Sequence, residues 1–174
     1  MWRRKRNHPT IAEDLRTFYP RLWRYALVLT GGRDWADDVA QTTCLKALEK
    51  QAQFQPGSHF DRWLFRIAQR VWYNEVRAQA VRRGSGLVAI DSADLVDMGL
   101  DADMSYFARQ LLTQVMALPE AQRIAVLLVY VEGYSYQEAA TVMEVPKGTI
   151  MSRLAAARSK LTNRLAEAPA ETAS

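Results

Sequence analysis

Cysteine and histidine are scarce in this sequence: its 174 residues include one cysteine, Cys44, and two histidines. A single cysteine excludes an internal disulfide and any cysteine-rich zinc site. His8 and His59 lie far apart, and neither has a Cys or His cluster nearby. Asp37 and Asp38 are adjacent, so on a helix they diverge by about 100° and are poorly placed to hold one metal ion. We therefore predict no metal site, no cofactor, no catalytic residue and no enzymatic activity.

Long apolar runs are also missing, since none approaches the roughly 20 residues of a membrane span. The basic stretch at residues 3–6 is not followed by the apolar segment of a signal peptide. We therefore expect a soluble, cytoplasmic protein that does not insert into a membrane. Hydrophobic residues make up 49% of the chain, which is enough for packed cores, and the net charge of +4 favours a polyanionic partner.

Alternating apolar residues, the signature of strands, are almost absent, whereas helix-period apolar stripes recur from residue 10 onward. The pattern predicts an all-α fold. We expect helices over about 11–30, from about 34 to 52, and over 61–83. Ser58 followed by Asp61 resembles a capping box that would begin the third of these helices.

The sequence predicts two small helical domains, 8–83 and 105–167, joined by a linker over 84–104. The linker region carries five aspartates and no Lys or Arg between residues 84 and 107, and it is poor in helix signals. In the second domain a helix is expected after Leu118-Pro119. That helix, which carries Ile124, Leu127, Leu128 and Val131, is expected to pack under the helix-turn-helix.

Two short helices joined by a tight turn are predicted near the C-terminus. Ser135 and Glu138 form a capping box, so a helix begins there. The segment 145–148, Val-Pro-Lys-Gly, ends that helix. A second helix follows with an apolar stripe of Ile150, Leu154, Ala157, Leu161 and Leu165. This arrangement is typical of a helix-turn-helix that enters the DNA major groove.

The second of these helices is basic, with five Lys or Arg and no acidic residue over 147–165. Small side chains opposite the apolar stripe would let the backbone approach a groove floor, and the cations beside them could reach phosphates. A solvated amphipathic helix at the end of a bundle is the alternative. The candidate contacts to duplex DNA are Lys147, Thr149, Ser152, Arg153, Arg158 and Lys160.

The long helix 61–83 combines six arginines with several aromatic residues. Arg66, Arg70, Tyr73 and Arg77 line one of its faces. Cations for the backbone and rings for stacked bases are what separated nucleic-acid strands require. The alternative is that the aromatic rings belong to the core and the arginines are solvated.

Taken together, these segments resemble the bacterial sigma factors, specifically the small extracytoplasmic-function (ECF) group. Residues 37–43, Asp-Asp-Val-Ala-Gln-Thr-Thr, are similar to the family's region 2.2. Residues 60–68 match its Phe-x-x-Trp-Leu-x-x-Ile-Ala stretch. Residues 118–120 and 133–140 are similar to its region 4, and 145–154 is close to its Val-Pro-x-Gly-Thr-Val-x-Ser-Arg-Leu motif.

The resemblance implies two helical domains that bind core RNA polymerase and recognise promoter DNA. Polymerase contacts would fall on Asp38, Gln41 and Leu45. The loop 55–59 would capture a base extruded from the −10 element, and the basic helix from Lys147 would read the −35 element. The resemblance also implies an anti-sigma protein as a partner. The implied contacts to the −10 region are Ser58, His59, Trp63, Arg66, Arg70, Tyr73 and Arg77.

The chain departs from the family pattern at several positions. Arg70 stands where Asn is frequent, and Asn74 stands where Asp is frequent. Glu144 replaces the usual turn glycine, so it must adopt a conformation that glycine tolerates better, at about 1 kcal/mol. Met143 replaces a leucine, and Met151 stands where a basic residue is common.

Two other functions remain open at this stage. A dimeric helix-turn-helix regulator would explain the C-terminal domain, but it leaves the aromatic, basic helix and the acidic face at Asp38 without purpose. A sigma mimic that titrates an anti-sigma protein is the second alternative. Known mimics of this type carry a receiver domain, and the sequence shows no βα alternation.

Overall fold

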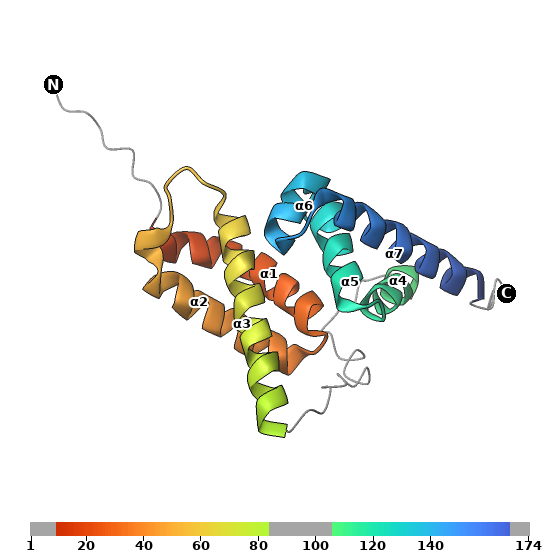
Figure 1. Ribbon diagram of the computed structural model, residues 1–174, viewed down its shortest axis with the longest axis horizontal. Coiled ribbons are helices and arrows are strands. Elements are labelled where there is room, and N and C mark those ends of the chain that lie inside the picture. The colour runs from red at the N-terminus through yellow and green to blue at the C-terminus, as the bar shows by residue number, and fades with distance from the viewer. Residues whose placement is uncertain (1–9, 84–105, 168–174) are drawn as a thin grey trace.

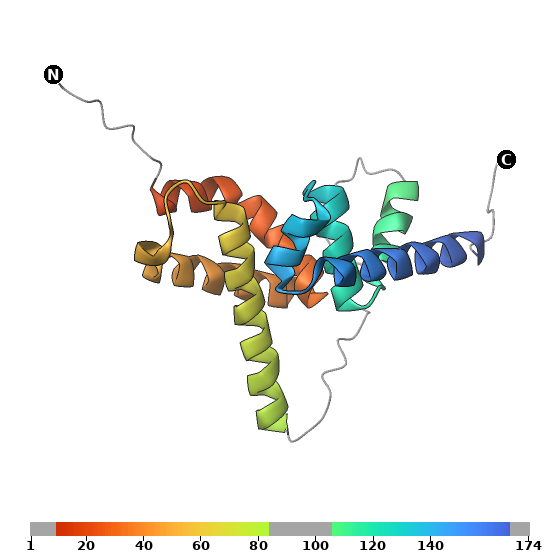
Figure 2. The same cartoon turned by 45° about the horizontal axis from the view of Figure 1, so that its top comes forward.

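The computed structural model describes residues 10–83 and 106–167, and within these ranges the chain forms seven α-helices and no strand. The expected all-α fold is confirmed. Helices α1–α3 form the first domain and α4–α7 the second, and the two lie against each other (Figures 1 and 2). The proposed linker 84–104 and the residues before Thr10 lie outside the described part of the chain.

The first domain is a three-helix unit whose ends follow local sequence signals. α1 (Ile11–Thr30) begins with a capping box between Thr10 and Glu13 and ends at Gly31, which has φ +83°. α2 (Arg33–Glu49) follows after two glycines and leads into a short 3-10 turn (Gln51–Gln53). α3 (Phe60–Arg83) packs across both earlier helices.

The second domain contains the expected helix-turn-helix. α4 (Tyr106–Met116) and α5 (Glu120–Val126) precede a π-helical turn (Leu127–Val131). α6 (Tyr136–Met143) and α7 (Lys147–Glu167) then form the motif.

The local signals predicted for the helix-turn-helix are confirmed. Ser135 and Glu138 make the predicted capping box at the start of α6. Ile150, Leu154 and Ala157 of α7 are buried, as expected for its apolar stripe.

The expected capping box of Ser58 and Asp61 is wrong. α3 begins one residue earlier than expected, and Ser58 Oγ donates to the carbonyl oxygen of Gln55 at 2.7 Å. The Asp61 carboxylate accepts a hydrogen bond from the hydroxyl of Tyr134, 73 residues away. The other Asp61 carboxylate oxygen accepts from the backbone N–H of Arg62 at 2.9 Å, so neither oxygen bonds back to Ser58.

Of the four apolar residues on the helix that was expected to pack under the helix-turn-helix, Val131 is not buried, since the residue is 57% exposed. The segment 127–131 is a π-helical turn, which has more residues per turn than an α-helix. The wider turn rotates Val131 away from the face that Leu127 and Leu128 share, and both of those leucines are buried.

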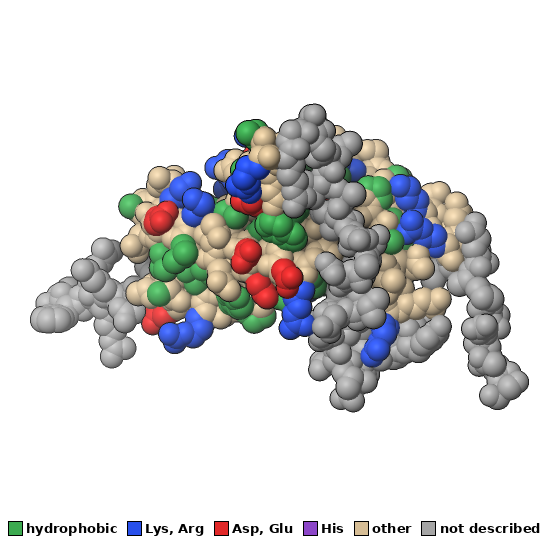
Figure 3. Space-filling view, turned by 90° about the horizontal axis from the view of Figure 1, so that it is seen from below, with side chains coloured by type: hydrophobic (Ala, Val, Ile, Leu, Met, Phe, Trp, Pro, Cys, Tyr) green, Lys and Arg blue, Asp and Glu red, His purple; other side chains and the backbone are tan. Residues whose placement is uncertain are grey.

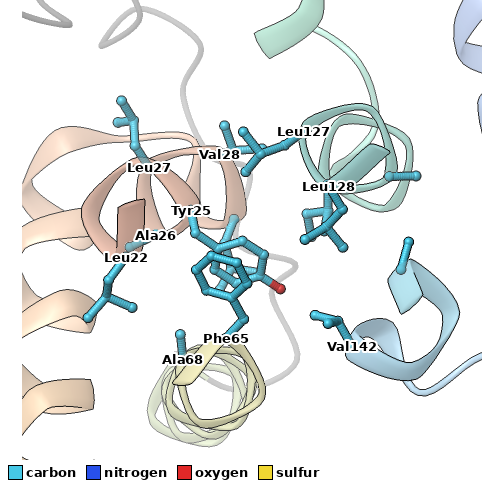
Figure 4. Packing of buried hydrophobic residues seen from close by; sticks show 14 of the residues in the cluster. Leu22, Tyr25, Ala26, Leu27, Val28, Phe65, Ala68, Leu127, Leu128 and Val142 are labelled. Atoms are coloured by element: carbon cyan, nitrogen blue, oxygen red, sulfur yellow. The ribbon is translucent and has the colours of Figure 1, made fainter. Parts of the chain in front are cut away.

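One hydrophobic core runs through both domains (Figure 4). Tyr25 of α1 and Phe65 of α3 stack with their ring centroids 4.2 Å apart. Leu127 and Leu128 from the π-helical turn and Val142 from α6 face this pair from the second domain. Each such side chain contributes about 1.5–3 kcal/mol when fully buried, so the contact between the domains is a packed one.

Candidate nucleic-acid interface

Acidic and basic side chains are concentrated on different parts of the described surface, so the net charge of +4 does not give the charge of any one face. The view from below shows acidic side chains gathered beside apolar ones, with Lys and Arg side chains around them (Figure 3). Each candidate interface therefore depends on the charges of the particular helices and loops that form it.

A groove of about 730 Å³ lies between α2 and α3. Asp38, Gln41 and Leu45, the three residues predicted to contact the polymerase, all line it. Leu45 is 62% exposed, so an apolar side chain stands at the surface beside a carboxylate and an amide. Asn74 and Glu75 of α3 also line the groove. The lining thus combines apolar groups and two carboxylates with one cation, Lys46, and such a surface suits a partner that is apolar and mainly basic.

Trp23 determines which of the two adjacent aspartates faces outward. Trp23 Nε1 donates to Asp37 Oδ1 at 2.6 Å, which holds the half-buried Asp37 against α1. Consecutive side chains on a helix diverge by about 100°, so Asp38 is left exposed on the groove side. Beneath the groove, Trp35 packs edge-on against Trp72 with ring centroids 5.9 Å apart.

The loop 55–59 projects between two open pockets. A pocket of about 550 Å³ on one side is lined by residues of α1 and the loop, and one of about 410 Å³ on the other side includes α3 residues. Ser58 and His59 line both pockets. Trp63 and Arg66 join them in the smaller one. Four of the seven residues predicted for the −10 region are therefore brought together.

An aromatic cluster anchors both ends of this loop. Phe54, before the loop, lies 5.5 Å from Phe60 and 5.1 Å from Trp63 between ring centroids. Phe18 of α1 packs on Phe60 at 5.4 Å. The exposed loop is thus held at a defined position above α3, as a site for one specific base requires.

The other three predicted −10 residues, Arg70, Tyr73 and Arg77, are exposed along α3 beyond the loop. The Arg70 guanidinium lies 3.0 Å from the Glu144 carboxylate. The Tyr73 hydroxyl donates to Glu120 at 3.1 Å, and burial together with the Glu120 charge raises the pKa of Tyr73 to about 12. Part of the basic face of α3 is therefore in contact with the second domain.

The predicted duplex-reading helix α7 has one face against α5 and one toward solvent. Thr149 and Arg153 are half-buried, and an Arg153 guanidinium nitrogen lies 3.8 Å from the Met143 sulfur. The candidates that are exposed to solvent are Lys147, Ser152, Arg158 and Lys160.

Glu144, in the turn of the motif, has φ +52°, and it is the one non-glycine residue with positive φ among those described. The left-handed conformation expected from its replacement of glycine is confirmed. This backbone conformation is strained for a residue other than glycine. The Glu144 side chain, however, makes an ion pair with Arg70 that a glycine could not make.

Two arginines with clear structural roles escaped the sequence reasoning. Arg62 lines the smaller pocket and forms an ion pair with Glu138 of α6. Arg123 is buried and donates to backbone carbonyls at the end of α1. Their partners lie 76 to 95 residues away, so no local pattern could have indicated them.

In the part of the chain that the structure describes, no helix is long and apolar enough to cross a membrane. Nor does this part of the chain hold a group of three His, Cys, Asp or Glu that could bind a metal ion.

Comparison with known proteins matches both domains. The family models for sigma-70 region 2 and sigma-70 region 4 match residues 14–82 and 108–161. Over 155 residues the chain is 34% identical to the ECF RNA polymerase sigma factor EcfG of Rhodopseudomonas palustris, covering 88% of this chain and 83% of that protein. It is 32% identical over 138 residues to the ECF sigma-E factor of Escherichia coli K12, covering 74% and 72%.

A solved structure is similar as well. The sigma factor RpoE from Bartonella quintana, in its complex with the anti-sigma factor NepR, aligns with a TM-score of 0.72 at 27% identity, covering 89% of this chain and 96% of that one. Matches to both sigma domains, in order, on a two-domain helical fold show that this chain belongs to the ECF sigma factors, the transcription initiation factors that direct bacterial RNA polymerase to particular promoters.

Proposed function

We propose that the groove between α2 and α3 is the site through which this sigma factor binds core RNA polymerase. The observation that supports this most is that Asp38, Gln41 and Leu45, chosen from sequence alone, line one groove. Glu75, which pairs with Arg82 at 2.7 Å, adds a second carboxylate to the same surface. A basic, partly apolar helical surface of the polymerase is its expected partner.

The loop 55–59 and the adjoining face of α3 are proposed to bind the opened −10 element. The support is geometric: two pockets flank the loop, and Arg66 lies in one of them beside Trp63. A base that leaves the stack could enter there, and Arg70, Tyr73 and Arg77 would hold the strand further along. Capturing a base costs a few kcal/mol of unstacking, which contacts in the pocket would offset.

Helix α7 is proposed to read the −35 element as duplex. Its apolar stripe is buried against the rest of the domain, which directs Lys147, Ser152, Arg158 and Lys160 outward. Arg158 and Lys160 are proposed to contact phosphates, and Arg153 is proposed to contact either bases or phosphates.

Lys160→Ala should weaken binding of all duplex sequences to a similar extent, since a phosphate contact carries no sequence information. The slope of log K against log salt should decrease in magnitude by about one. Fluorescence anisotropy on two unrelated duplexes between low and moderate salt measures both quantities. Thr162→Ala, a neutral change at another exposed position of α7, is the matched control. A change in base preference with Lys160→Ala would contradict this assignment.

In vitro transcription tests the proposed function as a whole. Core polymerase from the source bacterium, with fragmented genomic DNA, should start transcripts at defined positions only when this chain is added. A dimeric helix-turn-helix regulator or a sigma mimic would produce no such start sites. The assay therefore separates the sigma factor from both alternatives raised by the sequence.

We further propose that an anti-sigma protein restrains this chain in the cytoplasm, where polymerase and promoters are found. The support is the likeness to RpoE, which was solved in complex with NepR. The partner is expected to compete with polymerase for the first domain. Affinity capture from the native lysate should recover a second protein besides polymerase.

A further inference from the structure

Three carboxylates of the second domain lie against the face of α3 that is proposed to bind the −10 strand. Glu138, at the start of α6, forms an ion pair with Arg62. Glu144, after α6, forms one with Arg70 at 3.0 Å. Glu120, at the start of α5, accepts hydrogen bonds from Tyr73 at 3.1 Å and from Trp72 at 3.3 Å. These acceptors come from separate parts of the domain and follow one helix.

A carboxylate and a DNA phosphate are alternative partners for the same donors, because both offer anionic oxygens to a guanidinium. While Glu144 occupies Arg70, that guanidinium is not available to a DNA strand. Thr141 of α6 also lines the smaller pocket beside the loop, with Arg62 and Arg66. The second domain therefore covers part of the surface that single-stranded DNA would use.

The closed arrangement is also too compact for a promoter. Elements at −10 and −35 are about 25 base pairs apart, or roughly 85 Å along B-DNA at its rise of about 3.4 Å per pair. In the structure the turn of the helix-turn-helix touches the −10 face directly, because Arg70 and Glu144 lie 3.0 Å apart. One chain cannot read both elements in this state. The connecting segment 84–105 would reach roughly 75 Å if fully extended, so its length permits separation.

Exposed ion pairs do not explain why the domains stay together. Arg70 and Glu144 are 65% and 54% exposed, and such pairs contribute little stability. The stronger contacts lie on α1. The Glu132 side chain is 2% exposed and accepts hydrogen bonds from Arg21 at 2.6 Å and from Arg24 at 2.7 Å.

Arg123 adds a second contact at the end of α1. Its guanidinium donates to the carbonyl oxygens of Val28 and Leu29, the latter at 3.1 Å. The last carbonyls of a helix lack helical partners and carry partial negative charge, so a cation there is favourable. A Cβ atom on Gly31 would approach this guanidinium to 3.1 Å, and φ +83° also favours glycine at that position. The second domain thus caps a helix of the first.

We propose that this sigma factor inhibits itself: Glu132 and Arg123 hold the second domain on α1, and Glu120, Glu138 and Glu144 then occupy the −10 face of α3 in place of DNA. The inference rests on the proposed role of α3. The contacts between the domains fall into two groups with different effects. The contacts on α1 determine whether the chain is closed, whereas the three carboxylates determine how strongly closure competes with DNA.

Glu132→Arg tests the closure, because it places a third cation beside Arg21 and Arg24. Small-angle scattering of the full chain should show a larger radius of gyration than the wild type. Binding of a labelled 20-nucleotide single strand should tighten by about tenfold or more. Glu49→Arg makes the same charge change at an exposed position of α2, away from the contact between the domains, and should change neither the radius nor the affinity beyond a small electrostatic effect.

The triple variant Glu120→Gln, Glu138→Gln and Glu144→Gly tests the competition. Gln at position 138 retains the capping box, and Gly at 144 suits the positive φ, so the fold should be kept. Single-strand affinity should rise by about tenfold, with a smaller change in radius than Glu132→Arg produces. Arg66→Ala with Arg77→Ala in the Glu132→Arg background should remove that gain.

The outcomes separate closure from the proposed function. An extended wild-type chain would overturn the proposal. So would a Glu132→Arg chain that opens, gains no affinity for the single strand, and still starts transcription with core polymerase. If the opened chain gains affinity that does not depend on Arg66 and Arg77, closure competes with DNA at some face other than α3, and both the role of α3 and the self-inhibition through it are wrong.

Discussion

Asp38→Arg is expected to abolish co-purification of this sigma factor with core RNA polymerase. The side chain is exposed and lines the groove between α2 and α3, so reversing its charge places a cation against a basic partner surface. Like charges across an interface cost several kcal/mol, and about 3 kcal/mol corresponds to a loss of affinity of roughly 100-fold. Pull-down with tagged core enzyme, followed by titration at low and moderate salt, measures the effect.

Glu49→Arg is the matched control for this experiment. Glu49 is an exposed carboxylate on the same helix, 11 residues further along, which is about 16 Å and beyond the Debye length of about 8 Å at physiological salt. It does not line the groove. Circular dichroism should show that both variants have the same helix content as the wild type, because neither side chain is buried. A folded Asp38→Arg protein that binds core at wild-type affinity would refute the assignment of the groove.

Replacement of residues 55–59 by a Gly-Ser segment of equal length should prevent promoter opening and leave core binding intact. The exchange removes Ser58 and His59, which line both pockets. It retains Phe54, Phe60 and Trp63, so the aromatic anchor of the loop is kept. If the loop supplies the few kcal/mol that extrusion of a base requires, strand opening should fall by about 100-fold.

Permanganate footprinting on a duplex promoter reads strand opening directly. A template with a pre-melted −10 region provides the internal control, because its bases are already unstacked and the defect should be smaller there. Core binding, measured by the same pull-down as for Asp38→Arg, should be unchanged. Normal permanganate reactivity on the duplex after the exchange would exclude the loop from base capture.

Closure of the chain also affects how strongly the loop exchange changes DNA binding. In the closed state Arg62 and Arg70 are paired with Glu138 and Glu144, so a defect in DNA binding could be hidden by self-inhibition. Repeating the loop exchange in the Glu132→Arg background removes that masking. In this background the loop exchange should reduce binding of free single strands by a larger factor. If polymerase itself opens the chain, the effect of the exchange in assays with core polymerase should stay the same.

Features that depend on neighbouring residues could be predicted from the sequence. The capping box of Ser135 and Glu138, the end of α1 at Gly31 and the break at Pro146 involve residues within a few positions of each other. A hydrogen bond between such residues needs little loop closure, so the pattern carries its own structure. The helices, the helix-turn-helix and the family could therefore be predicted from the sequence, and so could the left-handed conformation of Glu144.

The contacts between the two domains could not be predicted from the sequence, because they join residues far apart in the chain. The bond from Arg123 to Val28 joins residues 95 apart, and that from Tyr73 to Glu120 joins residues 47 apart. Asp61 was expected to cap its own helix but pairs with Tyr134, because burial between domains selects partners by proximity in space. Nothing in the charge pattern distinguishes Arg62 and Arg70, which pair with carboxylates of the second domain, from the other arginines of α3. Such contacts form only after the helices have packed, so they depend on the whole fold and not on any local segment.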